Sequence, residues 1–422
     1  MNEQSLMLSL IRKEICDSEY TFKVAESLSE EQLTALYRLS KSHDMAHVVA
    51  KGLDEAGLLG ESAIAFKFQK QQMLAIYRAE GLRYALEEVS SLLEAANIPF
   101  IPLKGAVIRS LYPEAWMRTS CDLDVLVHPE HLDAAVEALM ASGSYRCGEK
   151  GTHDVSLMSA SGVHVELHFD LLEEGRAARS VPVLETLWSH AVLADGCRAT
   201  YALSDEMYYF YHVAHLAKHF EHGGCGVRPF LDLWILNHRM EENVEKRNAL
   251  LEKGGLLQFA KAAERMSEVW FSGASEDALT ERFAPYVFQS GAYGTTEQRV
   301  QMGKAKSGGF RYVWGRIFAP MSYLKKQYPI LERHPWLCPF YQVKRWFSIL
   351  FDGRAKRAAR ELKISASASW NSFSVSDASP PFGGFCAVQS SFSASIPPSC
   401  APLSVKYTIA AQLISPPPGI RW

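Results

Sequence analysis

The chain has 422 residues, of which 48% are hydrophobic and 22% are charged, so it can bury a sizeable core and contain more than one structural unit. Its formal net charge of -3 excludes a general electrostatic attraction to nucleic acid or to anionic lipid. The start of the chain lacks a basic segment that leads into an apolar stretch, and no window approaches a bilayer-spanning length of uninterrupted apolar residues. Eight cysteines occur without C-x-x-C spacing. We therefore expect a cytoplasmic protein with free thiols, without a secretory signal or a transmembrane segment.

The first 97 residues have a helical pattern, which predicts a helical N-terminal subdomain over residues 1–97. Periodicity is clearest from Phe66 to Ala96. The apolar positions that supply this periodicity are Phe66, Met73, Ile76, Tyr77, Tyr84, Val89, Leu92 and Leu93.

From Ile98 the pattern changes to short strands, and we expect residues 98–203 to form a core of strands and helices. Prolines make the segment up to Gly105 extended, and residues 106–111 then have the pattern of a short helix. Lys-Gly at a helix N-terminus offers backbone N–H groups to a phosphate, with Lys104 as a mobile charge beside them. Such a pair is also common in ordinary turns. A second helix is predicted over residues 129–142, between Pro129 and Gly143.

Acidic residues alternate with apolar ones in two predicted strands. In residues 121–127 the period of two places Asp122 and Asp124 on one face and the apolar residues on the other. In residues 163–168 the same period places Glu166 on one face with His164 and His168. If the two strands are neighbours, the three carboxylates converge, and oxygen ligands of this kind suit Mg²⁺ with water and substrate phosphates in its remaining positions.

Acids on a surface strand can serve solubility alone. The Lys-Gly pair upstream, Arg118 just before the first acid and Glu166 downstream favour a metal site instead. Arg118 has two possible roles: its planar guanidinium can neutralise phosphate charge, or it can brace Asp122.

The helical pattern returns at Ser204 and predicts a helical C-terminal region over residues 204–363. Its first helix carries His212, His215, His219 and His222 at spacings that place them on one face. One interpretation is a partly buried aromatic helix whose histidines bond to neighbours. The others are contact of His215 or His219 with a nucleotide or its acceptor, and a metal cluster.

Two further segments differ in composition. Residues 310–363 carry twelve Lys or Arg against three Asp or Glu, interleaved with aromatic residues, which suits RNA, a membrane surface or simply amphipathic packing helices. Residues 364–422 are rich in serine and proline and almost devoid of charge, which predicts a disordered tail. An out-of-frame C-terminus is an alternative explanation.

Taken together, Leu103-Lys104-Gly105, the segment from Arg118 through Ser120 to Val127, and Val165 to His168 resemble the uncharacterised nucleotidyltransferase family of the polymerase-β-like superfamily. The resemblance implies a small mixed sheet flanked by helices, hence an α+β fold. It implies that Asp122 and Asp124 bind metal ions, that Glu166 is the third carboxylate and helps to activate the acceptor hydroxyl, and that Gly105 shapes the phosphate loop. This chain has Lys-Gly where most of the superfamily carries Gly-Ser.

The sequence therefore predicts a metal-dependent nucleotidyltransferase that uses Mg²⁺ or Mn²⁺, takes a nucleoside triphosphate, with ATP as the expected donor, and releases pyrophosphate. The catalytic and metal-binding residues are predicted to be Asp122, Asp124 and Glu166. The nucleotide-binding residues are predicted to be Lys104, Gly105, Arg118, Ser120, His215 and His219. The acceptor is unidentified. The rival hypotheses are a non-catalytic nucleotide-sensing or interaction module on the same fold, and a metallohydrolase centred on the histidines.

Overall fold

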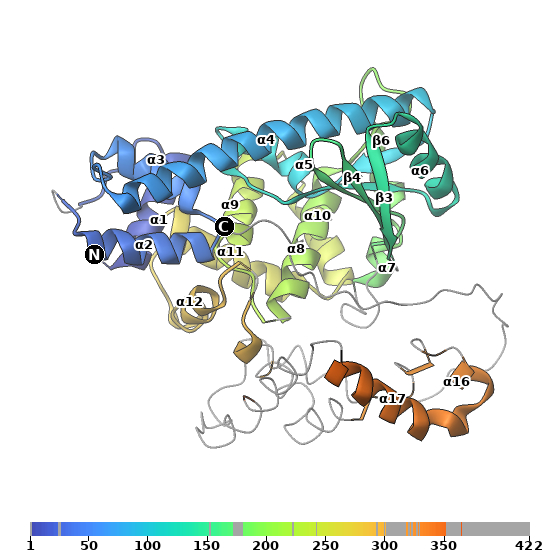
Figure 1. Ribbon diagram of the computed structural model, residues 1–422. Helices are drawn as coiled ribbons and strands as arrows, with labels where there is room; N and C mark the ends of the chain where they lie inside the picture. Colours follow the sequence, from blue (N-terminus) through green and yellow to red (C-terminus); the bar gives the residue numbers. More distant parts are fainter. Residues whose placement is uncertain are drawn as a thin grey trace. The chain divides into compact units, whose positions relative to one another are not determined.

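The computed structural model describes residues 2–23, 27–151, 153–171, 180–221, 223–241, 243–292, 294–298 and 300, with parts of 318–351 and residue 364. The chain divides into two compact units, Met1–Met302 and Gly303–Trp422. The first unit contains the N-terminal helices, the sheet and the helices that follow it (Figure 1). The subdomain boundaries predicted near residues 97 and 203 both fall inside this unit and stay proposals. The predicted tail, residues 364–422, lies outside the described residues except for Ile364.

Helices form the N-terminal part of the first unit. They are α1 (Glu3–Ile11), a π-helical turn (Arg12–Cys16), α2 (Glu30–Ser42), α3 (Ala46–Glu55) and α4 (Ala63–Ala95). Local sequence defines where they begin: Ser29 and Gln32 form a capping box at the start of α2, and the Ser62 hydroxyl accepts the Ala65 N–H at the start of α4. The N-terminal half of α4 packs on α2 and α3, and its C-terminal half runs along the sheet (Figure 1).

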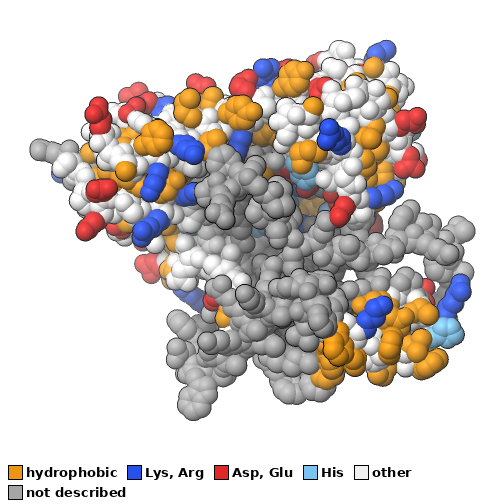
Figure 2. Space-filling model, in the orientation of Figure 1, with side chains coloured by type: hydrophobic (Ala, Val, Ile, Leu, Met, Phe, Trp, Pro, Cys, Tyr) orange, Lys and Arg blue, Asp and Glu red, His pale blue; other side chains and the backbone are white. Residues whose placement is uncertain are grey.

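The predicted long helix is confirmed as α4, but most of the apolar residues that define its periodicity do not lie on its buried face. Five of the apolar residues that define the periodicity are exposed, by 38% to 73%: Phe66, Met73, Ile76, Tyr77 and Tyr84. Figure 2 shows apolar side chains on the surface over this helix. Small residues supply much of the buried face instead, among them Ala75, Ala79 and Ala85, because short side chains let neighbouring elements approach the helix closely.

A five-stranded mixed sheet follows. Its strands are β1 (Phe100–Pro102), β2 (Asp122–Val127), β3 (Tyr145–Lys150), β4 (Asp154–Ser159) and β5 (His164–His168), in the spatial order β1-β2-β5-β4-β3. Strands β2 and β5 pair in parallel, and the remaining pairs are antiparallel. The predicted pair of acidic strands is therefore adjacent at the centre of the sheet.

One face of the sheet packs into a hydrophobic core. Leu123, Val125 and Val127 of β2 and Val165 and Leu167 of β5 are almost fully buried, as the period of two predicts. The C-terminal half of α4 covers this face together with α6 (Leu132–Ala141). A 3-10 turn over Pro129–His131 precedes α6, so the predicted helix over residues 129–142 is confirmed. The acidic residues consequently lie on the opposite face.

The short helix predicted after Gly105 is α5 (Gly105–Ile108), continued by a 3-10 turn (Arg109–Leu111); a second 3-10 turn, Ala115–Met117, precedes β2. After the sheet come α7 (Val181–Leu184), a 3-10 turn (Leu187–His190) and a hairpin of β6 (Ala191–Leu193) and β7 (Tyr201–Leu203). The remaining helices are α8 (Asp205–Glu221), α9 (Arg228–Arg239), α10 (Val244–Lys253), α11 (Leu257–Phe271) and α12 (Ala278–Ser290). The predicted helix beginning near Ser204 is thus confirmed as α8.

The described part of the second unit contains α16 (Ile330–Arg333), a 3-10 turn (Pro335–Leu337) and α17 (Cys338–Phe351). Its small core is formed by Ala319, Leu324 and Leu331. Part of the basic and aromatic region predicted over residues 310–363 falls here, and residues 310–317 and 352–363 lie outside the described part. Phe340 and Phe347 of α17 are exposed by 63% and 55%, so packing within the described residues does not account for all of the aromatic side chains.

Buried neutral histidines predict that the first unit loses stability in acid. Burial lowers the pKa of His43, which is fully buried, from 6.5 to about 4. Burial also lowers the pKa of His47, whose Nε2 lies 2.9 Å from the Met117 carbonyl oxygen. Because the unfolded chain binds more protons than the folded chain below pH 6.5, the free energy of unfolding falls as the pH drops toward 4. For His43 alone the loss is about 3 kcal/mol.

Urea unfolding followed by tryptophan fluorescence, at about pH 7.5 and about pH 4.5, measures this loss. The variant His43→Leu removes the titrating ring from its contact with Phe288, and we expect a flatter dependence of stability on pH. If the free energy of unfolding of the variant depends on pH as steeply as that of the parent chain, His43 does not contribute to the acid sensitivity.

Candidate active site

The face of the sheet opposite the core carries the acidic residues. In the parallel pairing of β2 and β5, Asp122 lies opposite His164, and Asp124 lies opposite Glu166. On the other side of β5, Ser156 of β4 also lies opposite Glu166. Residues in register on one face have their Cβ atoms about 5 Å apart, so these side chains form a continuous polar surface across three strands.

Asp124, Glu166 and His168 form a cluster that could hold a metal ion. One ligand atom from each of the three lies within 4.8 Å of the others, and within the described ranges no other group of three such residues does so. The Nε2 atom of His168 lies 2.8 Å from Asp124 Oδ1 and 3.4 Å from Glu166 Oε2. Asp124 and His168 are buried, and Glu166 is partly exposed.

Two cations already contact the carboxylate of Asp124. The ammonium group of Lys104 donates a 2.6 Å hydrogen bond to Oδ1, the same oxygen that His168 contacts. Burial alone would raise the pKa of Asp124, but Lys104 and His168 outweigh it and hold this pKa well below its usual range. Burial would likewise lower the pKa of His168, but its hydrogen bonds to Asp124 and Glu166 raise it to about 8. Asp124 is therefore ionised and charge-compensated.

Asp122 is in a different electrostatic environment. It lies on the same face as Asp124 but outside the three-residue cluster, and it forms no ion pair with the residues described here. Burial and the negative charge of Asp124 raise the pKa of Asp122, and Glu166 contributes in the same direction. The structure thus brings the three predicted carboxylates to one face, but only two of them lie within ligand distance of a common point.

Lys104 and Gly105 connect the first strand to this face. Lys104 has a positive φ of 48° with ψ at -120°, an unusual conformation for a residue other than glycine, which turns its side chain to Asp124. The Leu103 N–H donates to the Asp124 carbonyl, and the Tyr208 hydroxyl donates to the Lys104 carbonyl at 2.6 Å. At Gly105 a Cβ atom would lie 3.1 Å from Ser120 Oγ, so close packing favours glycine there.

Arg118 has its bracing partner in Asp232 of α9 and not in Asp122. Its Nε and Nη2 atoms donate to the two oxygens of Asp232 at 3.1 and 3.0 Å, and Nη1 donates to the Thr119 carbonyl. Arg118 and Asp232 are both buried, and the Tyr112 hydroxyl donates a further 2.6 Å hydrogen bond to Asp232. The loop before β2 is therefore anchored to α9 by a bidentate ion pair.

Ser120 is held by a second arginine. Arg109 Nη2 donates to Ser120 Oγ at 2.7 Å, and this hydroxyl lies 3.2 Å from the Asp122 carbonyl. Burial, together with the charge of Arg118, lowers the pKa of Arg109 to about 10. Ser120 thus links the arginine network to the backbone of the acidic strand.

The histidines of α8 do not act as one group. His212 bonds to the Pro229 carbonyl, whereas His215 and His219 contact each other through their Nε2 atoms at 3.0 Å. His222 lies outside the described residues. Burial, and then the positive charge of Lys104, lower the pKa of His215 well below its usual value, so its ring is neutral. His215 is thus within electrostatic range of Lys104, whose ammonium group contacts Asp124.

Three contributors to the site, His168, Tyr208 and Asp232, had no assigned role in the sequence prediction. His168 follows the same alternation as Glu166 and could have been assigned from that signal. Tyr208 and Asp232 could not have been assigned from the sequence, because Tyr208 contacts Lys104 and Asp232 contacts Arg118 across more than one hundred positions.

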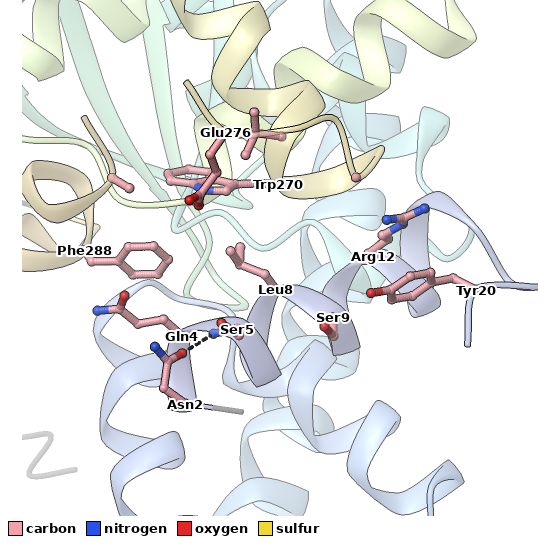
Figure 3. A pocket seen from close by; sticks show the side chains of 13 residues that line it. Asn2, Gln4, Ser5, Leu8, Ser9, Arg12, Tyr20, Trp270, Glu276 and Phe288 are labelled. Atoms are coloured by element: carbon pink, nitrogen blue, oxygen red, sulfur yellow. Dashed lines mark hydrogen bonds between the residues drawn. The ribbon is translucent and has the colours of Figure 1, made fainter. Parts of the chain in front are cut away.

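A separate pocket of about 310 Å³ lies between α1, α11 and α12 (Figure 3). Leu8, Trp270 and Phe288 are among its apolar lining residues, and Arg12 and Glu276 are among its charged ones. No residue of the five-stranded sheet lines it, so this pocket is not part of the acidic site.

The fold and the acidic face together define a class: an α+β protein with a nucleotidyltransferase core between helical flanks. The sequence profile of the family described as "Uncharacterised nucleotidyltransferase" matches residues 29–272, and the chain belongs to this family. Family membership makes it an enzyme of the transferase class. A comparison with curated proteins finds none that matches. Within the described residues, no helix has both the length and the apolar character needed to span a bilayer.

Proposed function

We propose that this chain is a divalent-metal-dependent nucleotidyltransferase that moves a nucleotidyl group from a nucleoside triphosphate to an acceptor and releases pyrophosphate. The observation that supports this most directly is the cluster of Asp124, Glu166 and His168, with Asp122 beside it on the same sheet face. The family assignment supports the reaction class. ATP as the donor, and a cytoplasmic location, are parts of the proposal.

The donor set fits a hard divalent cation. Carboxylate oxygens suit Mg²⁺ and Mn²⁺, and the imidazole of His168 is a further ligand that Mn²⁺ accepts more readily than Mg²⁺ does. Asp122 adds a carboxyl group on the same face, and a cation bound there would offset the burial and the repulsion by the neighbouring carboxylates that raise its pKa. Asp124, Glu166 and His168 would hold the metal, and Asp122 is proposed as a further carboxylate ligand from the same sheet face. When bound, the metal supplies Lewis-acid stabilisation of charge on the triphosphate.

Lys104 and Gly105 are proposed to bind the triphosphate. Because the Lys104 ammonium lies 2.6 Å from Asp124 Oδ1, it is already next to the carboxylates that face the phosphates. A flexible side chain can exchange this contact for a phosphate oxygen while keeping its charge. Gly105 keeps the backbone close to Ser120, whose position depends on Arg109.

Arg118, Ser120, His215 and His219 complete the proposed nucleotide site. The buried ion pair of Arg118 with Asp232 suggests that Arg118 contributes by holding the loop before β2 in place. His219 is exposed and contacts the partly buried ring of His215, and these two histidines are proposed to lie against the base or the ribose. Docking of an anionic acceptor by residues 310–363 is a further proposal, which rests on the basic and aromatic composition of this region.

One observation favours a second candidate function, a nucleotide sensor without turnover. Lys104 and His168 already compensate the charge of Asp124, so the site is electrostatically stable without a metal ion. Binding of a nucleoside triphosphate in the presence of a chelator, without pyrophosphate release when Mg²⁺ or Mn²⁺ is restored, would support the sensor. No contact among the described residues favours the histidine-based metallohydrolase.

Glu166→Gln tests the proposed reaction. The substitution keeps the shape of the side chain but removes a charge beside His164 and His168, and we expect transfer to fall by about 10² to 10⁴-fold with much of the Mg²⁺-nucleotide affinity retained. Single-turnover transfer measures the loss of rate, and calorimetric binding of Mg²⁺-nucleotide to the same preparation measures the affinity. Glu149→Gln, the same change at an exposed position of β3, is the matched control.

Transfer at the parent rate would remove Glu166 from the reaction. Loss of Mg²⁺-nucleotide binding would assign its carboxylate to the nucleotide side of the site instead of the acceptor side.

A further inference from the structure

A serine and a histidine on the acidic face have no role in the function proposed above. Ser156 Oγ lies 2.6 Å from His164 Nε2, and His164 Nδ1 lies 3.8 Å from Glu166 Oε1. With its proton on Nδ1, the His164 ring accepts the Ser156 hydroxyl hydrogen at Nε2 and turns its N–H toward Glu166. A hydroxyl, a base and an orienting carboxylate in this order are the arrangement that activates a nucleophile.

The register of the sheet places this hydroxyl next to the proposed reaction centre. Glu166 lies opposite Asp124 on β2 and opposite Ser156 on β4. Asp124, Glu166 and Ser156 therefore form one row across three adjacent strands, all on the acidic face. Neighbouring strands are about 4.8 Å apart, so the Ser156 backbone lies about 10 Å from that of Asp124. Ser156 is on the side of Glu166 that faces away from Asp124 and Lys104.

The environment of Ser156 leaves it accessible. Ser156 is only partly buried, and the His164 side chain is 32% exposed. On β3 Gly148 lies beside Ser156: a Cβ atom at Gly148 would lie 3.4 Å from Ser156 Oγ and 3.2 Å from its carbonyl oxygen. The pairing of β3 with β4 shifts register just after Cys147. A glycine at this irregularity keeps the space beside the hydroxyl open.

We propose that Ser156 is an internal acceptor, so that the chain transfers a nucleotidyl group to its own hydroxyl. This inference rests on the proposed function and names an acceptor for it. Ser156 Oγ forms a bond to the α-phosphorus, and the bond from that phosphorus to the oxygen bridging the α- and β-phosphates breaks. Pyrophosphate leaves with the electron pair, and the hydroxyl proton passes to His164 Nε2. The product is a phosphodiester between Ser156 and the nucleoside.

The test is incubation of the full chain with Mn²⁺ and each of the four nucleoside triphosphates, followed by intact-mass measurement and peptide mapping. We expect a mass increase of one nucleoside monophosphate less water, on the peptide that contains Ser156. Ser156→Ala is expected to abolish the adduct, and His164→Gln to slow its formation by about 10² to 10⁴-fold. Ser156→Thr keeps a hydroxyl and is expected to retain slow labelling.

Controls separate modification from loss of folding or binding. Ser142→Ala removes a hydroxyl that donates to the Leu139 carbonyl and accepts the Ser144 N–H at the end of α6, so labelling is expected to be unchanged. Ser156→Ala is expected to keep the parent melting temperature and the parent calorimetric affinity for Mn²⁺-nucleotide. A Ser156→Ala variant that loses this affinity would assign the hydroxyl to nucleotide binding and overturn the proposal.

The failure of this proposal is distinguishable from failure of the proposed function. Pyrophosphate release with transfer to another residue or to an added acceptor, at the same rate in Ser156→Ala, would overturn the internal acceptor and leave the reaction class intact. Absence of pyrophosphate release with every nucleotide and with both Mg²⁺ and Mn²⁺ would overturn both.

Discussion

Asp124→Asn is expected to abolish nucleotidyl transfer and to destabilise the first unit. Asp124 is 2% exposed, and its Oδ1 atom contacts both Lys104 and His168. Removing one partner from a buried ion pair leaves an uncompensated charge and costs about 3 to 5 kcal/mol. Loss of a metal-binding carboxylate removes several kcal/mol of transition-state stabilisation, so transfer should fall by about 10³-fold or more.

Asp122→Asn is the matched control, because it makes the same chemical change two residues away on the same face. Burial and repulsion from Asp124 raise the pKa of Asp122, so the loss of its charge should leave the free energy of unfolding unchanged or higher. Transfer should still be lost if Asp122 binds metal. Urea unfolding and single-turnover transfer, measured on both variants, test this contrast. Equal destabilisation of the two variants, or unchanged transfer in both, would contradict the site described here.

Asp232→Asn is expected to destabilise the first unit by about 3 to 5 kcal/mol, because it leaves the Arg118 guanidinium buried without a counter-ion. Asp232 is 1% exposed and accepts hydrogen bonds from Arg118 and Tyr112. The loop that Arg118 anchors leads directly into β2, so the position of Asp122 and Asp124 should be disturbed as well. Urea unfolding measures the loss of stability, and transfer per folded molecule measures the effect on the site.

An exposed ion pair supplies the comparison for Asp232→Asn. Arg83 pairs with Glu87 on α4, where both side chains are more than half exposed, so Glu87→Gln should change the free energy of unfolding very little. The double variant Arg118→Met with Asp232→Leu removes both buried charges and should recover much of the lost stability. If Asp232→Asn costs no more than Glu87→Gln, the buried pair does not anchor the loop.

Local sequence was sufficient for much of the fold and for the face that carries the site. The alternation in residues 121–127 and 163–168 identified the strands, because side-chain direction in a strand depends only on the period of two. The long helix α4 was also predictable from its length and pattern. The buried face of this helix was not predictable, since several of its alanines are buried while many of its large apolar residues are exposed.

By itself, the sequence determined that Asp122 and Asp124 share one face of a strand, that Glu166 lies on one face of another strand, and that the chain resembles a nucleotidyltransferase. The tertiary structure placed the two strands side by side. Only the tertiary structure decided how the charges of these carboxylates are balanced. In the structure Asp124 pairs with Lys104 and His168, whereas Asp122 forms no ion pair with the described residues. Arg118 forms its ion pair with Asp232, which lies on a helix more than one hundred residues away in the sequence. The physical reason is that a buried charge must find a partner within a few ångströms, and local periodicity carries no information about which distant residue the fold brings that close.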